Sequence, residues 1–197
     1  LLDEQQASLL PAILIGLLLA SGGLWWLQSR RRRSRDSTYR ALLEQTRGQL
    51  LDSVLEQRPL LQLMERLAMS WSALQPGSNG SVLLVDEHAR INTIAAPGLP
   101  ASYSAQLDGL HAAEGVGSCG TAIARCAPVF VADVQTDPLW MPYQALAETG
   151  GFRSCWSMPF FDESGRVLGT FAVYGQQPGL PDTRARNWML EFTRLAA

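Results

Sequence analysis

An uncharged apolar stretch near the start of the chain limits its architecture more than any other feature. Residues 5–29 carry no charged side chain, and residues 9–27 read LLPAILIGLLLASGGLWWL. As a helix this run would be about 28 Å long, close to the thickness of a bilayer's hydrocarbon core. A buried core helix is the alternative, but soluble helices of this length usually contain a charged residue. The sequence therefore predicts a transmembrane helix over residues 9–28, with residues 1–8 as a short extracytoplasmic end.

The C-terminal end of this helix has the side chains of a membrane boundary. Two tryptophans and four arginines mark it: Trp25, Trp26, Arg30, Arg31, Arg32 and Arg33. Indole rings favour the level of the lipid headgroups, and arginine clusters beside a span stay on the cytoplasmic side. A cleaved signal peptide carries its positive charges before the apolar run, so this segment is predicted to be an anchor. We expect the chain from residue 30 onward to be cytoplasmic, with membrane lipid as a partner; specific binding of anionic lipid by the arginines is a further hypothesis.

The rest of the chain is acidic, although the net charge of the whole is only −2. Residues 1–35 contain five arginines and two acidic residues, which leaves eleven arginines and sixteen acidic residues, or −5, in residues 36–197. Nucleic-acid-binding domains need clustered positive charge, so we expect no nucleic-acid partner. Three cysteines exclude a disulfide scaffold, and no spacing of Cys and His predicts a metal site.

Residues 36–58 contain good helix formers, so residues 29–58 are predicted to form a basic juxtamembrane segment and a linker helix. A heptad seam can be placed here, and seven of its nine positions are apolar: Leu43, Arg47, Leu50, Val54, Gln57, Leu61, Met64, Ala68 and Trp71. The seam predicts a parallel coiled coil in a homodimer. The alternative is an amphipathic helix packed on its own domain. Pro59 would either kink the helix or open a new one over residues 59–74.

Short apolar runs separated by turn residues follow and predict an α+β domain. The predicted strands are residues 81–87, 90–96, 128–134, 154–161 and 166–175. The predicted helices are residues 101–109, 119–126, 137–150 and 181–197. The first two strands should form a hairpin, and residues 162–165 (DESG) should form the tight turn between the last two. Asp137 before Pro138 is a good start for the third helix.

Four ordered runs in this domain are recognisable: GVGSCGTA (115–122), PVFVADVQTDPLW (128–140), GFRSCWSMPF (151–160) and GRVLGTFAVY (165–174). In this order and spacing, residues 59–197 resemble the GAF domain, and more narrowly the subgroup found in bacterial diguanylate cyclases, cyclic-di-GMP phosphodiesterases and sensor histidine kinases. The resemblance implies a six-stranded antiparallel sheet flanked by helices, dimerisation through the terminal helices and a small-molecule pocket on one sheet face. It also implies that the predicted single-pass anchor lies in a bacterial inner membrane.

The residues that known GAF activities require are largely missing. The Asn-Lys-Phe-Asp-Glu signature of cyclic-nucleotide binding needs a lysine, and the chain has none, although another mode of nucleotide binding stays open. The Asp-Ile-Pro block of bilin-binding members is absent, because Asp133 is followed by Val134 and Gln135. Haem would need an axial ligand, for which the chain offers only His88, in a predicted turn, and His111, before the glycine-rich run. We therefore expect no cofactor.

The three cysteines raise the question of thiol chemistry. The GAF-type reductase of free methionine sulfoxide shares the G-x-G-x-C-G element of residues 115–120, but its nucleophilic cysteine lies about two dozen residues further on. That neighbourhood contains Tyr143 and no cysteine, so we expect no catalysis by this chain. Cys126 and Cys155 are predicted to be small buried hydrophobic side chains. Cys119, beside a helix N-terminus that would lower its pKa, is the best candidate for a redox sensor.

The resemblance places the walls of a ligand pocket on nine residues: Ser118, Cys119, Thr121, Trp140, Tyr143, Arg153, Trp156, Ser157 and Phe171. Aromatic walls with a few polar groups suit a small-molecule cavity, but they suit a hydrophobic core as well. The tryptophans and the phenylalanine are therefore interpreted first as packing residues. Arg153 should either pair with an acidic residue, Asp133 or Asp137, or bind an anionic ligand, and we favour the pair.

These features together predict a membrane-anchored, cytoplasmic sensory GAF domain of a bacterial signalling protein. A small ligand, which the sequence does not identify, would change the relative position of the terminal helices in a dimer. The last helix, ending FTRLAA, has no stop signal, so we expect an output domain for cyclic-di-GMP turnover or a kinase beyond residue 197. A ligand-free dimerisation and spacing module is the alternative. A thiol-based redox sensor and a sulfoxide-reductase-like enzyme are further hypotheses.

Overall fold

The computed structural model describes residues 40–197. The predicted extracytoplasmic end, the transmembrane helix over residues 9–28 and the arginine cluster lie outside the described residues. The chain divides into two compact units, Leu1–Glu44 and Gln45–Ala197, and every labelled element belongs to the second. Between residues 40 and 197, none of the helices is both long and apolar enough to cross a bilayer.

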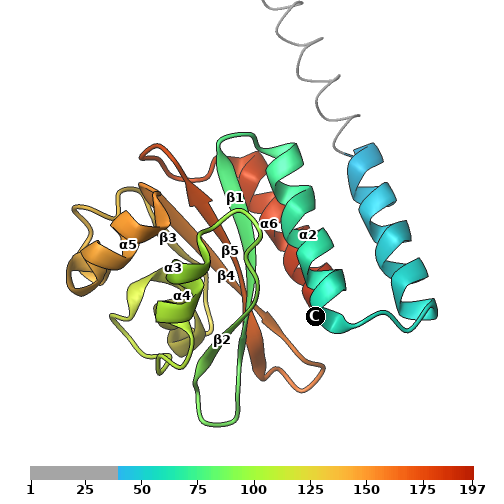
Figure 1. Ribbon diagram of the computed structural model, residues 1–197, viewed down its shortest axis with the longest axis horizontal. Coiled ribbons are helices and arrows are strands. Elements are labelled where there is room, and N and C mark those ends of the chain that lie inside the picture. The colour runs from blue at the N-terminus through green and yellow to red at the C-terminus, as the bar shows by residue number, and fades with distance from the viewer. Residues whose placement is uncertain (1–39) are drawn as a thin grey trace, which may run out of the picture. The chain divides into compact units, whose positions relative to one another are not determined.

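One antiparallel sheet of five strands, in the order β2-β1-β5-β4-β3, forms the centre of the domain (Figure 1). The strands are β1 (Ser78–Val85), β2 (Ile91–Ala95), β3 (Val129–Val131), β4 (Ser154–Phe161) and β5 (Val167–Gly175). Both predicted hairpins are confirmed, because β1 pairs with β2, and β4 pairs with β5 across the turn of residues 162–165. The five runs predicted as strands are all present, so the α+β class is confirmed.

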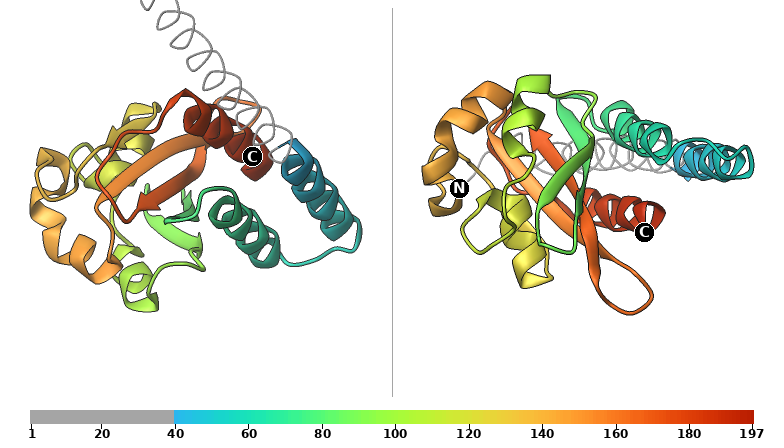
Figure 2. Two further views of the ribbon diagram at one scale, coloured as in Figure 1. Left: turned by 90° about the horizontal axis from the view of Figure 1, so that it is seen from above. Right: turned by 60° about the horizontal axis from the view of Figure 1, so that its bottom comes forward.

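Helices cover both faces of this sheet, as Figure 1 and the view from above in Figure 2 show. They are α2 (Leu60–Leu74), α3 (Ala101–Leu107), α4 (Gly117–Arg125), the 3₁₀ helix η1 (Pro138–Tyr143), α5 (Gln144–Gly150) and α6 (Thr183–Ala196). Helices α2 and α6 pack on one face, and α3, α4, η1 and α5 lie on the other. Successive side chains of a strand point to opposite faces, so the central strands supply a core to each layer.

The expected six-stranded sheet is wrong for the described residues, where five strands are present. Beyond β2, where the sheet could be extended, the chain makes only an isolated bridge between Arg90 and His111. Three backbone hydrogen bonds accompany it, from Ile91 N to Leu110 O at 2.9 Å, from Gly109 N to Ile91 O at 2.8 Å and from Ala112 N to Ala89 O at 2.7 Å. Gly109 turns the chain at a positive φ of 83° just before this bridge, and no further strand forms before α4.

Four aromatic side chains form the core between the sheet and the α2/α6 layer. Trp71 of α2 makes edge-to-face contacts with Phe171 of β5, with Trp188 and with Phe192 of α6, at centroid distances of 5.6, 6.4 and 5.5 Å. The indole N–H of Trp71 donates to Ser78 Oγ at 3.0 Å, so its polar atom is satisfied as well. This layer therefore joins both terminal helices of the domain to the same sheet face.

The opposite core lies under α3, α4 and η1. Phe152 packs edge-to-face against Tyr103, Trp140 and Tyr174, at centroid distances of 5.4, 5.4 and 4.8 Å. Cys155 of β4 is fully buried in the same cluster. The faces thus have separate aromatic cores, and a residue on one face cannot share a cavity with a residue on the other.

The predicted helix over residues 137–150 is divided into η1 and α5. Asp137 accepts a hydrogen bond from Leu139 N at 2.9 Å, so the expected cap is confirmed. Pro142 lies inside this segment and has no N–H to donate, which interrupts α-helical hydrogen bonding. The first part is therefore a 3₁₀ helix, and α5 begins only at Gln144.

The continuous heptad seam is wrong, because the chain folds back at residues 56–59. A helix over residues 40–55 ends there, Gln57 has a positive φ of 54°, and Pro59 precedes the first turn of α2. Thr46 Oγ1 donates to Ser70 Oγ at 3.2 Å, which places residues 45–55 beside α2. Three of the four seam positions in α2, Met64, Ala68 and Trp71, are buried in the domain's own core, and the fourth, Leu61, is exposed. The alternative, an amphipathic helix packed on its own domain, is correct for α2.

Candidate functional site

The nine residues predicted to line a pocket do not surround one cavity. Phe171 is fully buried on the α2/α6 face, against Trp71. Trp156 is also buried, and its indole N–H donates to Gly179 O at 2.9 Å. Both are packing residues, as their interpretation from sequence favoured. The other predicted residues lie on the α4/η1 side of the sheet or at its rim.

The N-terminal turn of α4 is held by a closed set of hydrogen bonds. Ser118 Oγ accepts from Trp140 Nε1 at 2.9 Å and donates to Cys155 O at 3.2 Å. Thr121 Oγ1 donates to Gly117 O at 2.6 Å and accepts from the N–H of Gly115 at 3.1 Å. The side chains of Ser118 and Thr121 are fully buried and satisfied within the protein. In this structure they stabilise the fold and present no free group to a ligand.

The space beside this turn is almost filled. Ser118, Cys119, Trp140 and Tyr143 border it, and its volume is about 10 Å³, which is roughly what a single water molecule needs. The pocket expected from the sequence is therefore closed in this structure.

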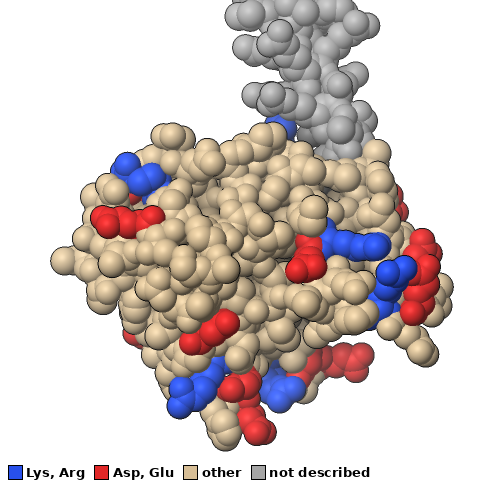
Figure 3. Space-filling model, in the orientation of Figure 1, with Lys and Arg blue, Asp and Glu red and all other residues tan. Residues whose placement is uncertain are grey.

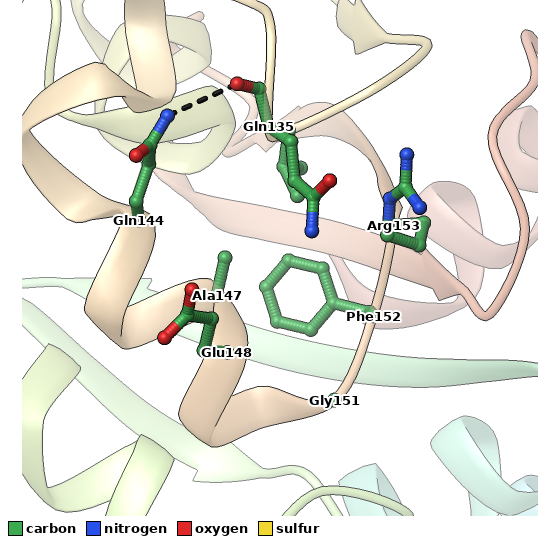
Figure 4. A pocket seen from close by; sticks show the side chains of 8 residues that line it. Gln135, Gln144, Ala147, Glu148, Gly151, Phe152 and Arg153 are labelled. Atoms are coloured by element: carbon green, nitrogen blue, oxygen red, sulfur yellow. Dashed lines mark hydrogen bonds between the residues drawn. The ribbon is translucent and has the colours of Figure 1, made fainter.

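A much larger cavity of about 480 Å³ lies on the outer side of α5, as Figure 4 shows. It is bordered by side chains from α5, from the segment after β3 and from the segment before β4: Val134, Gln135, Gln144, Ala147, Glu148, Gly151, Phe152 and Arg153. Val134, Ala147 and Phe152 are buried and form its apolar part, whereas Gln135, Gln144 and Glu148 are exposed and polar. Gln144 Nε2 donates to Gln135 O at 3.0 Å and so ties the start of α5 to the segment after β3.

An ion pair fixes the charged wall of this cavity. Arg153 donates to both carboxylate oxygens of Asp133, from Nε at 3.2 Å and from Nη2 at 2.7 Å. The predicted structural pair is thus confirmed, with Asp133 as the partner. The guanidinium lowers the pKa of Asp133, and the carboxylate raises the pKa of Arg153. The Arg153 side chain is 38% exposed, so it remains accessible from the cavity.

Of the residues around this cavity, only Arg153 was predicted from the sequence. Gln144 and Glu148 are four residues apart on α5, a spacing that places two side chains on one helix face. That spacing was visible in the sequence, but nothing in it indicated that this face would meet the segment before β4. The missed residues come from three separate segments, which only the fold brings together.

The two histidines and the charged residues give no second site. His88 is in an exposed turn, and His111, which was considered as a pocket residue, is exposed at the β2 edge. Within residues 40–197, no group of three His, Cys, Asp or Glu side chains is arranged to hold a metal ion. On the face shown in Figure 3, acidic and basic side chains are interspersed. Several are paired, as in Arg125 with Glu114 and Arg194 with Glu191.

The cysteines differ in exposure and ionisation. Cys126 was predicted to be buried but is exposed, because it ends α4 in a left-handed conformation with φ at 50°. Cys119 and Cys155 are buried. The Cys155 thiol first, and then the neighbouring hydroxyls, stabilise negative charge on the sulfur of Cys119 and lower its pKa to about 7. The lowered pKa agrees in direction with the prediction. Its cause is the thiol and hydroxyl side chains of the sheet beneath Cys119, whereas the prediction named the helix N-terminus.

The domain thus has an α+β fold with the terminal helices on one face of an antiparallel sheet and a cavity on the other side. The chain belongs to the GAF domain family, since the family model described as "GAF domain" matches residues 44–197. The match begins within the helix over residues 40–55, so it includes part of the segment predicted as a linker.

Similar proteins include both sensors and an enzyme. Over 125 residues the chain is 32% identical to the methyl sulfide methyltransferase-associated sensor of Methanosarcina acetivorans, covering 63% of this chain and 12% of that protein. The chain therefore spans about an eighth of the length of this relative.

Three solved structures share the fold. A protein of Burkholderia vietnamiensis described as a GAF sensor has a TM-score of 0.64 at 19% identity, covering 82% of this chain and 92% of its own. A domain from Sinorhizobium meliloti described as belonging to a two-component sensor histidine kinase has a TM-score of 0.56 at 23% identity, covering 68% and 86%. The free methionine-R-sulfoxide reductase of Neisseria meningitidis, in complex with its substrate, has a TM-score of 0.57 at 21% identity, covering 80% and 83%.

Proposed function

We propose that this chain is the membrane-anchored sensory part of a bacterial signalling protein, in which the GAF domain binds a small molecule and controls an output domain. The observation that carries the proposal is the cavity of about 480 Å³ beside α5. Its volume suits a small molecule, and it combines an apolar floor with a few charged and polar groups. The sensor and the sensor-kinase domain among the similar proteins support the same role.

The walls of the cavity favour a ligand that carries both an acidic and a basic or hydrogen-bond-donating group. Figure 4 shows Glu148 and Arg153 on different sides, with the Phe152 ring and the Gln135 amide between them. Arg153 would bind an anionic group with the N–H groups that Asp133 does not use. Glu148 would accept from the opposite end of the ligand, and the Phe152 ring would contact its apolar part.

Native mass spectrometry of the full chain, purified in mild detergent, tests this proposal. We expect a small molecule to be retained by the wild type and lost from Glu148→Arg. Glu163→Arg is the matched control, because it makes the same charge change in the exposed turn between β4 and β5. Equal retention by the two variants would contradict binding in this cavity.

Signal transfer would run from the cavity through β4 to the opposite face. Arg153 directly precedes β4, and Met158 of the same strand reaches α6, where Thr193 Oγ1 lies 3.9 Å from Met158 Sδ. A ligand that moves the start of β4 would therefore change the position of α6 on the sheet. Helix α6 is the last helix before the proposed output domain. Such a shift requires the ligand to bind one setting of the helix more tightly than the other.

In a homodimer, the proposed output domain could respond to this shift of α6. Apolar side chains with more than 40% exposure gather on the helix over residues 40–55, on α2 and on α6: Leu51, Val54, Leu55, Leu60, Leu61, Met69 and Leu190. We propose that a second copy covers part of this surface. Sedimentation equilibrium should show a dimer for the wild type and a weaker one for Val54→Glu, with Gln49→Glu as a control on the same helix. Unchanged dimerisation in Val54→Glu would exclude this surface.

A second candidate function is a dimerisation and spacing module without a ligand. The observation that favours it is the filled space of about 10 Å³ where the pocket was expected. An empty, tightly associated dimer in native mass spectrometry would support this function and would contradict ligand sensing.

A further inference from the structure

Four side chains that carry a thiol or a hydroxyl lie on the face of β4 and β5 beneath Cys119: Cys155, Ser157, Thr170 and Tyr174. The residue lies in the first turn of α4, above β4 and β5, and is buried. Tyr174 OH is 3.8 Å from Cys119 Sγ. The Cys155 thiol and the hydroxyls of Ser157 and Thr170 also lie close enough to stabilise a negative charge on this sulfur.

Two of these hydroxyls have no other role in the described structure. Ser157 Oγ and Thr170 Oγ1 are fully buried and have no hydrogen-bond partner. A buried hydroxyl without a partner is unfavourable and calls for an explanation. A thiolate at Cys119 would accept from both. The sheet face beneath α4 is therefore arranged for a thiolate at Cys119.

Cys155 has the opposite character, although it lies in the same cluster. Burial and the adjacent Cys119 raise the pKa of Cys155 well above its usual range. Its thiol stays protonated and can supply a proton, while the neighbouring thiolate is the nucleophile. The buried cluster therefore contains one sulfur that ionises readily and a second that stays protonated, and Ser118, next to Cys119, is hydrogen-bonded to the backbone of Cys155.

We propose that Cys119 is a site of oxidation by small hydroperoxides, and that Cys155 resolves the oxidised Cys119 as an intramolecular disulfide between α4 and β4. The Cys119 thiolate attacks the terminal oxygen of the hydroperoxide, the O–O bond breaks, and the alkoxide or hydroxide leaves and takes up a proton. The sulfur, oxidised by two electrons, becomes a sulfenic acid. Cys155 sulfur then attacks this sulfur, the S–O bond breaks, and water leaves with the Cys155 proton.

The small space beside Cys119 sets the size of the oxidant. About 10 Å³ admits a water-sized molecule and excludes bulky thiol reagents. Hydrogen peroxide is the smallest hydroperoxide, so it is the oxidant used in the test. Cys126 is exposed and serves as an internal comparison, because it is open to large reagents. The modification does not depend on the ligand cavity, which lies on the other side of α5, so either proposal can fail alone.

Peptide mapping of the full chain after treatment with hydrogen peroxide tests the proposal. A thiol with a pKa of about 7 is half ionised at pH 7, whereas an unperturbed thiol is ionised to about 3%. We expect Cys119 to react about tenfold faster than the cysteine of an unstructured peptide, with an inflection near pH 7 in the rate. The expected product is a disulfide between Cys119 and Cys155.

Three variants complete the experiment. Cys155→Ser should stop at the sulfenic acid, which dimedone traps at Cys119. Cys119→Ser should leave Cys155 reduced, and Cys126→Ser should form the same disulfide as the wild type. A reaction at Cys119 no faster than in the peptide, or no disulfide to Cys155 in the folded wild type, would overturn the proposal. The wild-type measurement decides even where a variant does not fold.

Discussion

Replacing Ser118 by alanine removes the acceptor of a buried indole N–H. Ser118 Oγ accepts from Trp140 Nε1 at 2.9 Å, and both side chains are buried. The neighbouring space holds about one water-sized molecule, so bulk solvent cannot replace the lost acceptor. A buried donor left unpaired costs about 1–3 kcal/mol. We expect the free energy of unfolding to fall by that amount.

Urea denaturation followed by far-UV circular dichroism measures this change. Trp140→Phe removes the donor, so in that background Ser118→Ala should cost less than about 1 kcal/mol, and the two substitutions should not add. Ser102→Ala is the matched control, because Ser102 is exposed on α3 and should change stability by less than about 0.5 kcal/mol.

Two outcomes would refute the reasoning. One is a Ser118→Ala protein as stable as Ser102→Ala, and the other is full additivity with Trp140→Phe. Unchanged stability together with loss of a retained small molecule would identify Ser118 as a ligand residue, contrary to its place in the fold.

Three further substitutions and one fusion test other parts of the structure. Phe171→Ala should cost about 3–5 kcal/mol in urea denaturation, because it removes a fully buried ring that packs on Trp71. Gly169→Ala should lower the yield of folded protein, because a methyl group there would collide with the backbone carbonyl of Leu83. The pKa of Asp162 is lowered to about 2, first by a hydrogen bond from a serine hydroxyl in its turn, so the wild type should lose stability as the pH falls from about 4 through 2. Asp162→Asn should show a smaller loss in urea midpoints measured against pH, because the carboxyl groups of Asp86, Glu114 and Asp133, whose pKa values are also lowered, remain. A periplasmic reporter fused before residue 1 should be active, and the same reporter after residue 197 should be inactive, if the predicted anchor and orientation are correct.

Local patterns predicted the elements of the domain because their causes are local. The turn of residues 162–165 combines an acidic side chain with a glycine, which can adopt the positive φ observed at Gly165. Asp137 before a proline marked the start of η1 for the same kind of reason. The break at Pro142 was not predicted, although its missing N–H is a local feature of the sequence.

The candidate site was harder to predict because its parts are distant in sequence. The residues predicted to line a pocket include Trp156 and Phe171, which the alternation along β4 and β5 sends to the α2/α6 face. The register of strand pairing decides which face of the sheet a side chain occupies, and a shift by one residue would move it to the opposite face. Register is set by pairing across the whole sheet, which no single strand reveals.

The same limit applies to the heptad seam. Apolar spacing predicts a buried stripe but does not say whether a partner or the chain's own sheet covers it. The turn at Gln57 and Pro59 and the packing of Trp71 decided in favour of the sheet.

The sequence alone predicted the membrane span with its arginines, the α+β class and the pairing of Arg153 with an acidic residue, because composition, periodicity and charge complementarity act over short distances. The family came from the resemblance of four ordered sequence runs. The tertiary structure decided that the pocket beside Ser118 is filled, that a cavity opens beside α5, and that two buried cysteines lie in one core cluster. These are properties of packing between segments up to dozens of residues apart. Their free energies depend on which surfaces meet, and this is defined only once the sheet has formed.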